Sequence, residues 1–80
     1  MIGLYDFMAM DDNQKGMTVF STPCLGDREE NGEFVQLYRI DEFYVEVFYD
    51  PAANRITRFR PFQNNELLVP YINISSVFIR

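Results

Sequence analysis

Two neighbouring segments of the chain combine charged and aromatic side chains at alternate positions. In Phe43–Tyr49 a glutamate falls between two rings, and in Arg55–Phe62 two arginines stand two positions apart. A carboxylate buried among rings has a raised pKa, which suits an acid or base catalyst. The same carboxylate can instead form an ion pair with an arginine of the adjacent strand. The candidate binding residues are Tyr44, Glu46, Phe48, Arg58 and Arg60.

The absence of histidine removes several kinds of chemistry. It excludes Ser-His-Asp and Cys-His catalysis and every metal site that needs imidazole ligands. The single cysteine, Cys24, lies between a proline and a leucine, so we expect an inert, partly buried thiol. We therefore predict no catalytic residue, no metal site and no cofactor. The alternative is a small enzyme in which Glu46 acts with Tyr44 or Arg60 as acid or base.

The uneven distribution of charge argues against nucleic acid as a partner. Residues 1–50 carry eleven acids against three bases, whereas residues 51–80 carry one acid against four bases, and the net charge is −5. A net acidic protein repels phosphate groups at long range. The acidic and basic parts can complement each other within one fold or across a dimer.

The length of the chain limits it to one domain with a thin hydrophobic core. It has 80 residues, of which 48% are hydrophobic, and it contains 8 Phe and 5 Tyr. A thin core favours association with a second subunit. The N-terminus lacks a signal-peptide pattern, and no apolar run approaches the ~20 residues of a membrane span. We therefore expect a cytoplasmic protein that has no membrane partner.

The first part of the chain has a helical pattern. Leu4–Met10 is apolar at helical spacing, and Asp11 can cap a second helix in a capping box with Gln14. Pro23 must end that helix. The sequence predicts one or two short helices within residues 3–21.

The rest of the chain has the alternation of strands. Asn31-Gly32 is a strong hairpin signal. Phe43–Tyr49 is apolar on one face and largely apolar on the other, where Glu46 is the one charge, as expected of a central strand. Pro51 and Asn54 suit a turn before the next strand. The predicted strands are Leu25–Glu30, Glu33–Ile40, Phe43–Tyr49, Arg55–Phe62 and Tyr71–Ile79, with one helical turn at Glu66–Val69.

The sequence leaves the pairing of two strands open. A four-residue loop in the hairpin of residues 43–50 and 55–62 places Asp50 opposite Arg55, whereas a five-residue loop places Glu46 opposite Arg60. The last strand, Tyr71–Ile79, can pair within the chain or with another subunit. The expected fold is α+β, in which a short N-terminal helical segment packs on a mainly antiparallel meander sheet of four to five strands. It forms a single domain over residues 1–80.

These features favour a non-catalytic protein-interaction module that forms a homodimer through an exposed strand or an aromatic sheet face. The alternative partner is a basic protein that this chain neutralises, in the manner of an immunity protein or antitoxin. That alternative predicts exposed acids around Asp27–Glu33 and Asp41–Glu42. The sequence indicates no small-molecule ligand.

Overall fold

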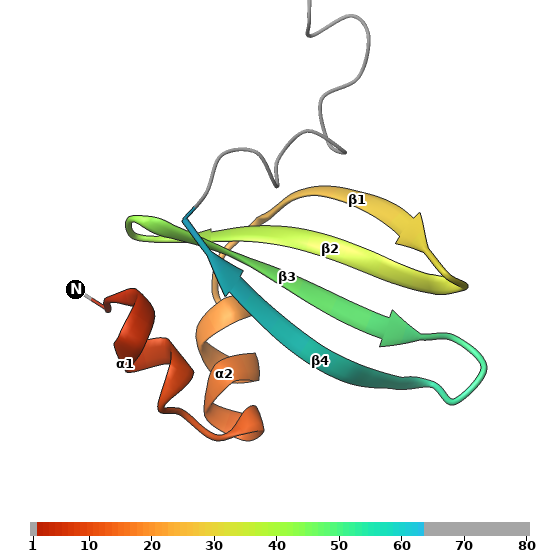
Figure 1. The fold of residues 1–80 in the computed structure, drawn as a ribbon, viewed down its shortest axis with the longest axis horizontal. Helices are drawn as coiled ribbons and strands as arrows, with labels where there is room; N and C mark the ends of the chain where they lie inside the picture. Colours follow the sequence, from red (N-terminus) through yellow and green to blue (C-terminus); the bar gives the residue numbers. More distant parts are fainter. Residues whose placement is uncertain (1, 64–80) are drawn as a thin grey trace, which may run out of the picture.

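The computed structural model describes residues 2–63 as two helices followed by four strands (Figure 1). The strands form one antiparallel meander in the order β1-β2-β3-β4, which confirms the predicted α+β class. The predicted helical turn at 66–69 and strand at 71–79 lie outside the described residues, and the single domain over 1–80 stays a prediction. The elements are α1 (Leu4–Met8), α2 (Asp12–Val19), β1 (Cys24–Glu30), β2 (Glu33–Ile40), β3 (Phe43–Asp50) and β4 (Arg55–Phe62).

The start and end of α2 follow from local hydrogen bonds. The carboxylate of Asp11 accepts from the backbone N–H of Gln14 at 2.8 Å, and the Gln14 side chain accepts from the N–H of Asp11 at 3.2 Å. This is the predicted capping box. At the other end the Thr22 hydroxyl donates to the carbonyl of Val19 at 2.8 Å, just before Pro23. The helix is therefore held to eight residues.

The turns use residues that tolerate a positive φ. Asn31 and Gly32 have φ values of 52° and 82°, as expected for a two-residue hairpin turn. Asn54 leaves the β3–β4 turn at φ 57°. The Asp50 carboxylate accepts from the N–H of Ala52 at 2.9 Å, which stabilises the entry to that turn.

The β3–β4 hairpin contains both of the pairings that the sequence left open. Next to the turn Asp50 pairs with Arg55, and further along Glu46 pairs with Arg60. The two registers differ by one residue, and a bulge at Thr57 in β4 takes up the difference.

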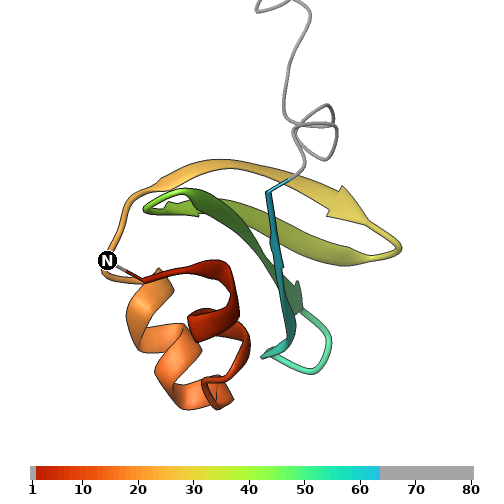
Figure 2. The ribbon, with the colours of Figure 1, turned by 60° about the vertical axis from the view of Figure 1, so that its left-hand side comes forward.

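Both helices lie on one face of the curved sheet, which we call the helix-bearing face (Figure 2). Phe7 of α1 packs against Phe43 of β3 with ring centroids 5.6 Å apart, and Phe20 at the end of α2 meets Tyr38 of β2 at 5.7 Å. The main core is formed by Phe7, Val19, Tyr38, Ile40, Phe43, Val45 and Val47.

The helices cover only part of this face. They lie beneath the end of the sheet that holds the β2–β3 turn, whereas the β3–β4 turn extends well beyond them (Figure 1). The eight residues of α2 make a helix about 12 Å long, while each eight-residue strand extends about 26 Å. The helix layer is therefore shorter than the sheet, and apolar side chains beyond it stay exposed.

Candidate functional site

The structure brings the five candidate binding residues together on the face opposite the helices, which we call the arginine face. Tyr44, Glu46 and Phe48 come from β3, and Arg58 and Arg60 come from β4. Strand alternation places each set on one side, and the observed register brings the two sets next to each other. Their role in binding stays a prediction.

Glu46 is completely buried in the arginine face. Arg28 of β1 donates to its Oε2 through Nη2 at 2.9 Å and Nε at 3.2 Å. Arg60 donates to its Oε1 through Nε at 2.8 Å and through Nη2. Because both carboxylate oxygens accept from guanidinium groups, the geometry is that of an ion-pair triad centred on a buried carboxylate. The side chains of Arg28 and Arg60 are 15% and 36% exposed.

Arg28 was missing from the residues selected by sequence. The hairpin turn at Asn31-Gly32 pairs Arg28 of β1 with Val35 of β2, and Val35 in turn pairs with Phe48 of β3. Following the pairing across three strands would have placed Arg28 near Glu46. Its Nη1 also donates to Glu30 at 2.6 Å, so this guanidinium lies between two carboxylates.

The ring of Phe48 lies beneath arginine side chains. The guanidinium carbon of Arg58 is 3.9 Å from the ring centroid, and those of Arg60 and Arg28 are 5.7 Å and 6.0 Å away. The ring itself is fully buried. It therefore takes part in cation–π packing and has no open face on which a nucleic-acid base could stack.

Tyr44 has a similar packing role at the other end of the arginine face. Its ring stacks on Phe62 with centroids 5.6 Å apart and an interplanar angle of 22°. The guanidinium of Arg39 lies 5.8 Å from the Tyr44 centroid. Each of the five selected residues is thus engaged by a neighbour of the same fold.

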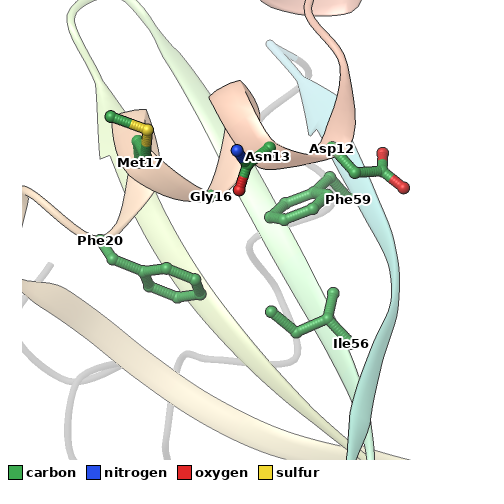
Figure 3. Close-up of a pocket in the computed structure, with 7 residues that line it drawn as sticks. All are labelled: Asp12, Asn13, Gly16, Met17, Phe20, Ile56 and Phe59. Carbon is green, nitrogen blue, oxygen red and sulfur yellow. The ribbon is translucent and has the colours of Figure 1, made fainter.

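A second surface lies on the helix-bearing face, where three adjoining hollows form what we call the trough. The first hollow, about 590 Å³, lies between α2 and β4, with Phe20, Ile56 and Phe59 pointing into it (Figure 3). A middle hollow of about 260 Å³ shares Phe20 and Ile56 with the first. An end hollow of about 390 Å³ shares Phe34 and Gln36 with the middle one. The apolar lining of the trough is Met17, Phe20, Phe34, Val47, Tyr49, Ile56 and Phe59.

The trough exposes large apolar side chains. Met17 is 71% exposed, Phe20 50%, Phe34 44% and Ile56 37%. The rings of Phe34 and Tyr49 lie nearly parallel, with centroids 6.5 Å apart, and both residues line the middle hollow. An exposed apolar patch of this kind is a candidate interaction surface.

The trough was not among the surfaces predicted from the sequence, although part of its signal was present. Strand alternation already placed Tyr49 on the same face of β3 as the core residues. Phe34 of β2 lies on that face too, because it pairs with Tyr49. A helix region limited to residues 3–21 cannot cover the helix-bearing face of four strands. The short helical region therefore already indicated that part of this face stays exposed. Which residues line the exposed part depends on where α2 packs.

Cys24 corrects one expectation. Its thiol is exposed, not partly buried. Cys24 begins β1, which is an edge strand of the described sheet, so its side chain has a neighbouring strand on one side only. The thiol donates to the carbonyl of Gly26 at 3.2 Å.

Comparison with known proteins adds no functional information. No protein-family model matches the chain, and neither the curated proteins nor the solved structures give a significant match. Within residues 2–63, acidic and cysteine side chains do not gather in a group of three that could hold a metal ion. Neither of the two described helices has the length and apolar character needed to cross a membrane.

Proposed function

We propose that this chain is a non-catalytic protein-interaction module that binds the apolar side of a partner protein's helix in the trough. The observation that carries the proposal is that the two helices of residues 2–63 leave part of the helix-bearing face uncovered. Beyond α2, Phe20, Phe34 and Ile56 are exposed along adjoining hollows. A helix from a partner, lying beside α2, would extend the layer over the rest of the sheet.

The geometry of Glu46 supports a role without catalysis. The side chain is the one that the sequence offered as an acid or base. Its two oxygens both accept from arginines, and it lines none of the three hollows of the trough. A general acid or base must reach its substrate within hydrogen-bond distance.

The trough suits binding of moderate strength. Full burial of a large apolar side chain contributes about 1.5–3 kcal/mol, and the trough offers four that are now partly exposed. The loss of translational and side-chain freedom offsets part of that gain. We therefore expect dissociation constants in the micromolar range, which correspond to a binding free energy of roughly −8 kcal/mol.

The test uses the full chain and a labelled peptide of about 18 residues, which as a helix is about as long as the strands. One side of this helix carries Leu and Phe, and the other carries only Ser and Gln. Fluorescence anisotropy should show saturable binding. Ile56→Glu should weaken it about tenfold or more, because a charge then enters the apolar floor. The matched control is Leu25→Glu, which changes an exposed apolar residue of β1 outside the trough and should leave binding unchanged.

Three results would overturn the proposal. The peptide could fail to bind the wild-type chain, or Leu25→Glu could weaken binding as much as Ile56→Glu does. The third result concerns self-association, which the sequence also predicted. If sedimentation equilibrium shows a dimer and Ile56→Glu dissociates it, a second copy of the chain occupies the trough. Circular dichroism of each variant would confirm that the sheet is intact.

A further inference from the structure

The two ends of the trough carry acidic side chains. Asp12, in the first turn of α2, lines the first hollow. Asp27 and Glu29 of β1 line the end hollow on the other side of Phe34. All three are exposed, and within residues 2–63 no ion pair engages any of them. Their charges are therefore open to a partner.

Among the described residues 2–63, basic side chains do not balance these acids along the trough. In this part of the chain neither Lys nor Arg lines the first or the middle hollow. Arg28 lines the end hollow, but its guanidinium already binds the carboxylates of Glu46 and Glu30. The trough thus combines an apolar floor with negative charge at both ends.

From this arrangement we infer that the helix bound in the trough is basic, with Lys or Arg side chains flanking its apolar side. This inference rests on the proposed function and names the chemistry of its partner. A second copy of the chain is disfavoured at long range, because both copies carry a net charge of −5. A basic segment gains attraction at both ends of the trough and faster association.

The experiment compares three labelled peptides that share one apolar side and differ at the flanking positions, which carry Lys, Gln or Glu. The Lys peptide should bind the full chain about tenfold more tightly than the Gln peptide, and the Glu peptide should bind least. Raising NaCl from about 0.02 M to about 0.5 M should remove most of this difference, since exposed charges are then screened.

Variants locate the effect on the chain. The triple variant Asp12→Asn, Asp27→Asn, Glu29→Gln should reduce the advantage of the Lys peptide over the Gln peptide to about one. The control is Glu42→Gln, which removes an exposed acid from the β2–β3 turn, away from the trough, and should keep most of that advantage.

The outcomes separate this inference from the proposed function. If the three peptides bind equally well, the inference is wrong and the trough is an apolar docking site without preference for charge. Glu42→Gln removes one charge and the triple variant removes three. If Glu42→Gln lowers the logarithm of the advantage by about one third of the change that the triple variant causes, the preference comes from net charge and the inference is again wrong. If the Gln peptide does not bind at all, the proposed function itself fails.

Discussion

The carboxylate of Glu46 and the guanidinium of Arg60 pair across β3 and β4 because β4 contains one extra residue, Thr57. The register set by Asp50 and Arg55 at the turn would, without the bulge, place Phe59 opposite Glu46. With the bulge, Phe59 pairs with Val47 on the helix-bearing face. One inserted residue thus lets the turn, the ion pair and the core form together.

Replacing Glu46 by Gln should destabilise the fold by about 3 kcal/mol, because Arg28 and Arg60 both lose their ion pair with this fully buried carboxylate. Urea unfolding followed by circular dichroism measures the change in the free energy of unfolding. The control is Glu42→Gln, an exposed acid of the β2–β3 turn, which should change stability by less than about 0.5 kcal/mol. A loss below about 1 kcal/mol for Glu46→Gln would contradict a structural role for the triad.

Arg58→Ala should lower the free energy of unfolding by about 1 kcal/mol, because its guanidinium packs 3.9 Å from the centre of the Phe48 ring. Arg55→Ala is the matched control, since Arg55 is exposed near the turn of the same strand. Differential scanning calorimetry of the two variants compares them directly. Equal losses would mean that the contact with Phe48 contributes nothing specific.

The sequence allowed the local structure to be predicted well. The capping box of Asp11 and Gln14, the turn at Asn31-Gly32 and the central position of β3 all depend on residues close together in the chain. Each is a short-range preference with its own physical cause, so no tertiary information was needed.

What escaped prediction depends on contacts between distant segments. The bulge at Thr57 has no strong local signal, and each of the two registers considered was correct on one side of it only. Arg28 joins Glu46 across eighteen positions of sequence, through two strand pairings. The trough depends on how far α2 extends over the sheet, and the alternation of residues within a single strand does not indicate that extent.

Replacing Gly16 of α2 and Gly32 of the β1–β2 turn by alanine should change the stability of the fold in opposite directions. Gly16 lies inside α2, where a new Cβ would be 3.7 Å from Phe20, an ordinary contact. Gly16→Ala should therefore stabilise the fold by up to about 1 kcal/mol. Gly32 has φ +82°, so Gly32→Ala should destabilise it by about 1–2 kcal/mol. Thermal unfolding measures both, and a destabilising Gly16→Ala would show that the helix lacks this room.

Tyr38 should make the fold less stable in alkaline solution. Burial raises the pKa of its hydroxyl, and negative charge on Cys24 adds to the effect. The hydroxyl also donates to Gln36 at 3.0 Å, which requires the proton. The folded chain therefore holds this proton more tightly than the unfolded chain does. The contribution of Tyr38 to stability is constant below the pKa of the unfolded chain, about 10, and is lost as the pH rises toward the higher pKa of the folded chain.

Replacing Tyr38 by Phe should therefore flatten the loss of stability above about pH 10, as measured by urea unfolding at each pH. Tyr5→Phe is the control, because Tyr5 is 80% exposed and its variant should keep the slope of the wild-type chain. If Tyr38→Phe shows the same alkaline slope as the wild type, other groups cause that loss. The proton of Tyr38 would then contribute nothing to the alkaline limit of the fold, and its ring alone, packed against Phe20, would account for its place in the core.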